Sequence, residues 1–122
     1  MMRTGKIKIR DKEYIICFST RVLIALEERE GDSTKGLQRI LSENKMADLF
    51  WLLEQMIDAG DRYAKLEGLE NPGRLALDEI IDAVGVDEYE TIFGSVATAV
   101  KAGNKATIEL KQSKNAKTTQ AE

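Results

Sequence analysis

The sequence predicts a mostly helical α+β domain, in which an N-terminal β-hairpin is followed by four to five amphipathic helices. Two observations carry this prediction. Residues 6–10 alternate apolar and charged side chains, which is the pattern of a half-buried strand, and an apolar run over residues 14–18 follows. Later segments place apolar residues three and four positions apart, the spacing of one helical face. Turn and cap residues, among them the only proline, Pro72, separate these segments.

The hairpin is expected from "GKIKIRDKEYIICFS". Ile7 and Ile9 point to one side of the first strand, and the turn is expected at Asp11-Lys12. The second strand, residues 14–18, is apolar on both faces, so it should be covered on both sides.

Two short helices should follow the hairpin. Ser19-Thr20 offers an N-cap for a helix that ends at Gly31, and "DSTKG" offers a second cap for a short helix that contains Leu37, Ile40 and Leu41. Asn44-Lys45 then separates this pair from a long helix, residues 46–68, whose buried stripe is expected to contain Met46, Leu49, Phe50, Leu53, Met56 and Ile57.

The C-terminal part should contain two more helices. After Asn71-Pro72-Gly73, a short helix is expected from Leu77 to about Gly85. Asp87 and Glu90 form a capping-box pattern that opens the last helix, and Gly103-Asn104 is expected to stop it. Residues 1–103 would then form one domain, and residues 104–122 a flexible polar tail.

Composition indicates a binding protein more than a catalyst. The chain has 122 residues, room for one domain, and no histidine, the commonest general base and metal ligand. No nucleophile–base pair or glycine-rich phosphate loop is visible, so we expect no enzyme, no cofactor and no metal. We expect a cytoplasmic protein, because Cys17 is the only cysteine and no signal-peptide pattern is present. We expect no membrane span, because the sequence has no apolar run of 18 residues.

The charge is unevenly distributed along the chain. Five cations and one carboxylate give residues 1–12 a net charge of +4, and four cations and two carboxylates give residues 104–122 a net charge of +2. The total is −3, so residues 13–103 carry −9. An acidic body argues against nucleic-acid binding, which depends on neutralising phosphates. Acidic groups at residues 27–32, 58–61 and 78–82 are predicted to be solvated surface.

Trp51, the only tryptophan, lies off the apolar stripe of the long helix, among polar neighbours. Leu52 widens the apolar arc of that helix on its other side, and Ile24 does the same on the first helix. Two interpretations of Trp51 remain open. The long helix could be central and covered on both sides, or Trp51 could anchor a contact with another protein chain, a role in which tryptophan is over-represented. Trp51, Leu52 and Ile24 are the candidate protein-contact residues.

The order of the segments "KEYIICFSTRVLIALEERE", "DLFWLLEQMIDAG" and "LDEIIDAVG" resembles the tail assembly chaperones of long-tailed bacteriophages and prophages, especially of Gram-positive hosts. The similarity covers about residues 5–102. It implies a non-enzymatic factor in the host cytoplasm, absent from the mature virion, that binds the tape measure protein and keeps it soluble. It also implies self-association and, through a frameshifted longer product, recruitment of the tail tube protein.

Two alternatives to the chaperone remain. A small regulatory or nucleic-acid-binding helical protein would use one helix of the bundle, although the acidic body and the lack of a Lys- and Arg-rich helix oppose it. A virion component of a phage, such as a head–tail connector, is also compatible with the sequence.

Overall fold

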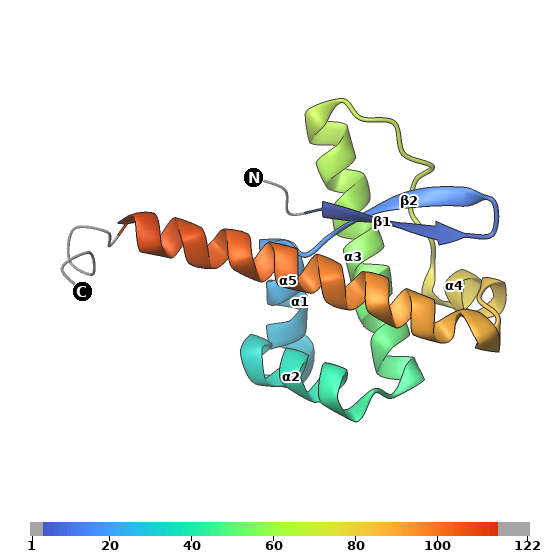
Figure 1. The fold of residues 1–122 in the computed structure, drawn as a ribbon, viewed down its shortest axis with the longest axis horizontal. Helices are drawn as coiled ribbons and strands as arrows, with labels where there is room; N and C mark the ends of the chain where they lie inside the picture. Colours follow the sequence, from blue (N-terminus) through green and yellow to red (C-terminus); the bar gives the residue numbers. More distant parts are fainter. Residues whose placement is uncertain (1–3, 115–122) are drawn as a thin grey trace.

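The computed structural model describes residues 4–114, and from residue 104 onward it describes the backbone alone. Its elements are β1 (Thr4–Ile9), β2 (Lys12–Cys17), α1 (Thr20–Glu30), α2 (Ser33–Glu43), α3 (Met46–Glu67), α4 (Leu77–Ala83), the short 3₁₀ helix η1 (Val86–Glu88) and α5 (Tyr89–Lys114). The predicted fold class is confirmed: an antiparallel two-stranded hairpin is followed by five α-helices (Figure 1).

The hairpin pairs β1 with β2 in a register that runs from Thr4 opposite Cys17 to Ile9 opposite Lys12. The turn therefore lies at Arg10-Asp11, one residue before the predicted position. Arg10 adopts a positive φ of 59°, a conformation that most side chains disfavour. The pairing leaves Lys6 and Lys8 exposed on one face of β1 and buries Ile7 on the other.

Helix α3 is the centre of the molecule. Its lower half in Figure 1 lies beside α1 and α2, and its upper half passes the hairpin. Helix α5 packs against β1 and β2, so β2 lies between two helices. This position explains why both faces of the second strand are apolar: residues 14–18 are all buried, as predicted.

The core is continuous from the hairpin through α3 to α5. Leu49, Leu53, Met56 and Ile57 of α3 are fully buried, in agreement with the predicted stripe. Met46 is an exception. It was expected in the stripe but is 50% exposed, because it begins the helix and lies beyond the end of the core.

Helix α5 does not stop at Gly103, and that prediction was wrong: the helix continues to Lys114. A Cβ atom at Gly103 would approach the backbone oxygen of Phe18 to 2.5 Å, so this glycine allows α5 to pack closely against the end of the hairpin. The predicted tail thus begins with helical backbone. Residues 115–122 lie outside the described residues, and flexibility of the tail stays a prediction.

The predicted capping box at Asp87 and Glu90 was also wrong. The chain turns earlier, in η1, where the carboxylate of Glu88 accepts a hydrogen bond of 2.8 Å from the backbone N–H of Gly85. The other boundaries agree better with expectation. Asp32 caps α2 by accepting from the N–H of Lys35, and Gly31 ends α1 in the left-handed conformation.

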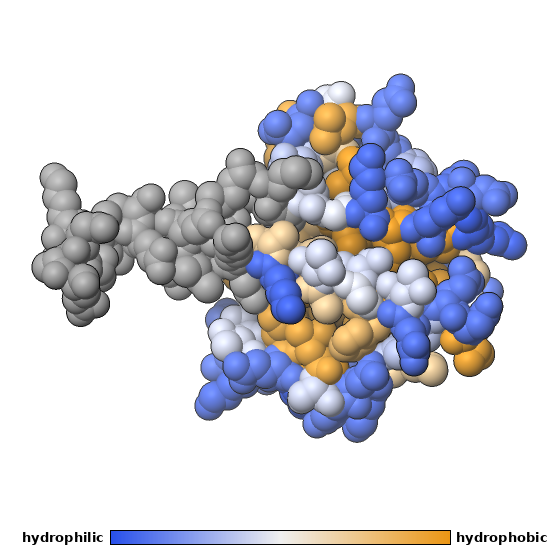
Figure 2. Space-filling model, viewed as in Figure 1, coloured by the Kyte–Doolittle hydropathy of each residue, from blue (hydrophilic) through white to orange (hydrophobic). Residues whose placement is uncertain are grey.

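The surface is mixed in character. Figure 2 shows a pale band of small side chains over α5, with apolar, orange areas on both sides of it and blue, charged side chains toward the rim. Six large apolar side chains are exposed among the described residues: Ile24, Met46, Leu66, Leu69, Ile81 and Val86.

Candidate protein-contact surface

Trp51 lies on the lower half of α3, where it faces α1. It is half-buried and packs against the edge of the core. The guanidinium carbon of Arg29, from α1, lies 4.5 Å from the centre of the indole ring, which is a cation–π geometry. Trp51 is therefore neither free on the surface nor fully in the core: one side touches the core and another is covered by Arg29.

Arg29 is held in this position by carboxylates. Its Nη2 donates to Oδ1 of Asp48 at 2.8 Å, and its Nη1 donates to Oε2 of Glu30 at 2.8 Å. Because Arg29 is fixed at two points, it can cover the indole ring without the loss of rotamer freedom that a mobile arginine would suffer.

Arg39 of α2 completes the charge network. It donates to both carboxylate oxygens of Glu30, at 2.8 and 2.9 Å, and to Oδ2 of Asp48 at 3.0 Å. Asp48 therefore receives one arginine from α1 and one from α2, and it joins both helices to α3. We call Arg29, Glu30, Arg39 and Asp48 the arginine–carboxylate network.

The network changes the protonation of its members. Hydrogen bonds from Arg29 and then Arg39 hold the pKa of Asp48 below its usual value, although burial opposes this. The bond from Arg39 likewise lowers the pKa of Glu30. Both carboxylates favour the charged form, which keeps the network intact at neutral pH.

Leu52 is not a surface residue. Its side chain is fully buried, with 0% exposure, so the prediction that Leu52 is a protein-contact residue was wrong. On the periphery of an isolated helix Leu52 looks available. In the fold it belongs to the core cluster, since α3 is surrounded by other elements.

Ile24 is exposed, as predicted, and 53% of its surface is accessible. It lies in an open groove of about 360 Å³ between α1 and α3, which we call the lower groove. The groove is lined by Arg21, Ile24, Ala25, Glu28, Gln55 and Asp58. Trp51 precedes Gln55 by one helical turn, so Trp51 and Ile24 lie along the same α1–α3 boundary.

A second groove continues this boundary toward the upper end of α3. This upper groove has a volume of about 560 Å³ and lies between the end of β2, the start of α1 and the second half of α3. It is lined by Cys17, Ser19, Arg21, Ala59, Arg62, Tyr63, Lys65 and Leu66. Arg21 lines both grooves, which makes them adjacent parts of one α1–α3 furrow.

The furrow is long enough to receive a helix, and its lining mixes charged residues with a few apolar ones. From Gln55 to Leu66 it follows α3 for about 16 Å, at 1.5 Å per residue, which is close to three helical turns. Ile24 and Leu66 offer exposed apolar atoms, with Leu66 83% exposed at the upper end. Such a surface can receive the apolar face of another helix.

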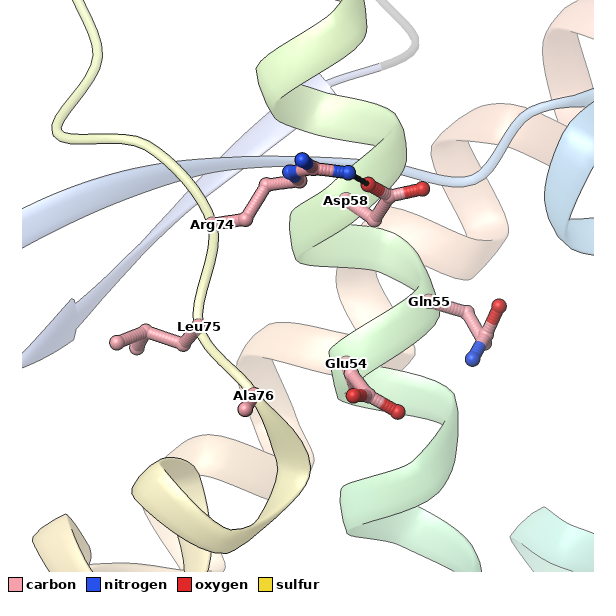
Figure 3. A pocket seen from close by; sticks show the side chains of 6 residues that line it. All are labelled: Glu54, Gln55, Asp58, Arg74, Leu75 and Ala76. Atoms are coloured by element: carbon pink, nitrogen blue, oxygen red, sulfur yellow. Dashed lines mark hydrogen bonds and ion pairs between the residues drawn. The ribbon is translucent and has the colours of Figure 1, made fainter.

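On the other side of Asp58, a further groove separates α3 from the segment before α4 (Figure 3). Arg74 reaches across it and donates to Oδ1 of Asp58 at 3.0 Å, while Arg62 donates to Oδ2 at 3.1 Å. Burial raises the pKa of Asp58, but the bonds from Arg74 and Arg62 outweigh it and leave this pKa below its usual value. Gln55 also lines this groove, and Figure 3 shows its side chain directed away from Arg74 and Leu75.

Several acidic residues predicted as solvated surface are instead paired with cations. Glu30 belongs to the arginine–carboxylate network, and Asp61 is 5% exposed, with Oδ2 3.2 Å from Nζ of Lys65. The amide of Asn71 also donates to Asp61 at 3.2 Å, and its oxygen accepts from the N–H of Ile15 at 2.9 Å. Asn71 thus joins α3 to the free edge of β2. Within residues 4–103, no group of three metal-ligating side chains is placed to hold an ion.

No sequence pattern indicated the upper groove. In the sequence, Tyr63 and Leu66 are ordinary residues near the end of a helix. The residues that face them in the groove, Cys17 and Ser19, are more than 40 positions away in the chain. Only the packing of α3 against β2 brings them together.

No protein-family model matches the chain, and no curated protein or solved structure is significantly similar to it. Among the described helices, none is both long enough and apolar enough to cross a membrane.

Proposed function

We propose that this protein is a tail assembly chaperone of a long-tailed phage or prophage, which binds the tape measure protein and keeps it soluble during tail assembly. The observation that carries the proposal is the α1–α3 furrow, an elongated surface with exposed apolar side chains on an acidic protein. A holdase for a long apolar helical partner needs this kind of surface and no reactive groups.

The net negative charge of the protein supports the same role. Residues 13–103 carry a net charge of −9, so a complex coated with this protein would repel its neighbours and remain in solution. Arg29, which covers part of Trp51, lies at the lower end of the furrow. A partner that displaced Arg29 would gain the indole as a further anchor.

The rest of the proposal follows from the family resemblance. The chaperone acts in the cytoplasm of the bacterial host, self-associates, and is absent from the finished particle. A frameshifted longer product would recruit the tail tube protein. The nucleotide sequence tests this last element: a slippery run with an overlapping reading frame near the end of the gene is expected.

The test is co-expression with the tape measure protein, encoded by a very long neighbouring gene. We expect the chaperone to keep the tape measure protein in the soluble fraction and to co-purify with it. Ile24→Gln combined with Leu66→Gln should lower the co-purified amount at least about ten-fold, because both exposed anchors of the furrow are lost.

The matched control is Val86→Gln, since Val86 is 86% exposed but lies outside the furrow. This variant should co-purify as the wild type does. Equal co-purification by a folded furrow variant would contradict the proposed surface, and failure of the wild type to solubilise the tape measure protein would contradict the function. Recovery of the protein from purified particles would favour the connector alternative.

A further inference from the structure

We infer that the upper groove binds an amphipathic helical segment whose apolar side chains are flanked by carboxylates. The inference deepens the proposed function, because it names the chemistry of the partner segment that the furrow selects. It rests on two properties of the groove: an apolar floor and a cationic rim.

The floor is made of small and aromatic side chains. Cys17 and Ala59 are buried, at 1% and 5% exposure, and Tyr63 is half-buried. Leu66 rises at the upper end with 83% of its surface exposed. An inserted leucine or isoleucine side chain would cover Leu66 and Tyr63, and each apolar side chain removed from water stabilises a complex.

The rim is cationic, and no carboxylate lines it. Arg21, Arg62 and Lys65 are the charged residues of the groove. Arg62 uses its Nε to bond Asp58, and Lys65 lies 3.2 Å from Asp61. Arg21 has no ion-pair partner within residues 4–103, so its charge is available to a ligand.

This rim contrasts with the molecule around it. The body of the protein is acidic, and a cationic partner is attracted to it as a whole. At the upper groove the local charge favours the opposite partner, because Arg21 can bond a carboxylate bidentately. Selectivity for an acidic segment would therefore act against the net charge, which makes it specific to this groove.

The experiment uses two helical peptides of about 18 residues, long enough to form a helix on binding. Both carry the same leucine stripe, and the flanking positions are glutamate in one peptide and lysine in the other. Binding to the full chain is followed by fluorescence anisotropy of labelled peptide, and the site by amide chemical shifts of Ala59, Tyr63 and Leu66. We expect the glutamate peptide to bind at least about ten-fold more tightly.

Three variants test the assignment. Arg21→Glu should abolish or reverse the preference for the glutamate peptide, and Leu66→Gln should weaken both peptides about ten-fold. Lys8→Glu is the matched charge reversal, on the exposed face of the hairpin, and should leave the preference unchanged. Equal or tighter binding of the lysine peptide, or loss of preference in Lys8→Glu, would overturn the inference.

Self-association is measured on the same variants by sedimentation. If Leu66→Gln disrupts an oligomer but does not change peptide binding, the groove is an interface between copies, and the inference is wrong.

The tape measure protein is tested in parallel. If the tape measure protein binds but the peptides show no acidic preference, the inference is wrong and the proposed function stands. If the glutamate peptide is preferred but the tape measure protein is not retained, the inference stands and the proposed function is wrong.

Discussion

The two halves of α3 are attached to the rest of the molecule in different ways. Residues 46–55 combine buried apolar side chains with a charged contact to α1 and α2, in which Asp48 is bonded to an arginine from each helix. Residues 56–67 face the hairpin through small residues, and at Gly60 the helix lies directly against the backbone of Ile15. We call the contact through Asp48 the charged joint. We call the backbone contact at Gly60 the hairpin joint, or backbone joint.

The difference determines which joint tolerates change. Arginine and carboxylate side chains can rotate and can exchange partners or bind water when one member is lost. A backbone carbonyl cannot move aside without moving the strand that carries it. We therefore expect substitutions at the hairpin joint to be more damaging than those at the charged joint.

The largest effect is expected for Gly60→Ala. The new Cβ would overlap the carbonyl oxygen of Ile15, so α3 and β2 would have to separate. The free energy of unfolding should fall by at least about 4 kcal/mol, measured by urea denaturation followed by circular dichroism. The control is Gly94→Ala in α5, where no atom lies within 4 Å of the added Cβ. This variant should be stabilised by about 0.5–1 kcal/mol, and equal effects at the two glycines would refute the backbone joint.

Asn71→Ala should have the second-largest effect. It removes the acceptor for the N–H of Ile15 and the donor to Asp61, and it leaves both groups without these partners next to the core. We expect a loss of about 2–3 kcal/mol in urea denaturation. Glu70→Ala, at the neighbouring exposed position, should change stability by less than about 0.5 kcal/mol. Equal losses of stability in Asn71→Ala and Glu70→Ala would show that the hydrogen bonds of Asn71 do not stabilise the edge of β2.

Asp48→Asn breaks the charged joint. The variant removes the carboxylate that Arg29 and Arg39 share, and each arginine keeps its bonds to Glu30. Because these partners remain, the loss should be about 2 kcal/mol, smaller than at Gly60. Glu27→Gln, an exposed residue of the same region, serves as the control and should be close to neutral. A loss at Asp48 as large as at Gly60 would remove the distinction between the joints.

The charged joint should also respond to acid. The pKa of Asp48 is lowered in the folded state, so its contribution is fully present above the unfolded value of about 3.9 and is lost as the pH falls through the lower folded value. The stability difference between wild type and Asp48→Asn should therefore be constant from about pH 8 to 5 and shrink below about pH 4. A difference that grows toward low pH would contradict the network as described.

Trp51→Ala should have the smallest effect on folding. The indole is only partly buried and is covered on one side by Arg29, so we expect a loss of about 1–2 kcal/mol in the free energy of unfolding and a folded protein. Trp51→Phe keeps an aromatic ring beneath Arg29, so its loss of unfolding free energy should be about half that of Trp51→Ala. A double-mutant cycle with Arg29→Gln, measured by circular dichroism, should give a coupling of about 0.5–1 kcal/mol. No coupling would mean that the stacked arginine does not hold the ring.

Local pattern predicted most of the fold. The hairpin, the helix end at Gly31, the cap within "DSTKG" and the buried stripe of α3 apart from Met46 all depend on neighbouring residues, and these were predicted. The errors share a cause. Gly103 has the appearance of a helix stop, but it serves a contact with Phe18, about 85 positions earlier in the chain. Spacing along a helix cannot reveal what lies opposite it.

The candidate surface was predicted less well for the same reason. Ile24 was correctly placed at the surface, but Leu52 is buried because α3 is covered on several sides. The carboxylates of Glu30 and Asp61 looked like solvated charge, and their cationic and amide partners could be found only in three dimensions. Leu66 became a candidate only once β2 and α3 were seen together.

The close contact of Gly103 with Phe18 has a consequence for the newly made chain. Strand β2, which is apolar on both faces, leaves the ribosome before the helices that cover it. About 85 residues separate Phe18 from Gly103, and at roughly 5–20 residues per second their synthesis takes several seconds. During that time the nascent hairpin exposes apolar surface. The proposed chaperone would therefore itself be prone to aggregation while it is being synthesised.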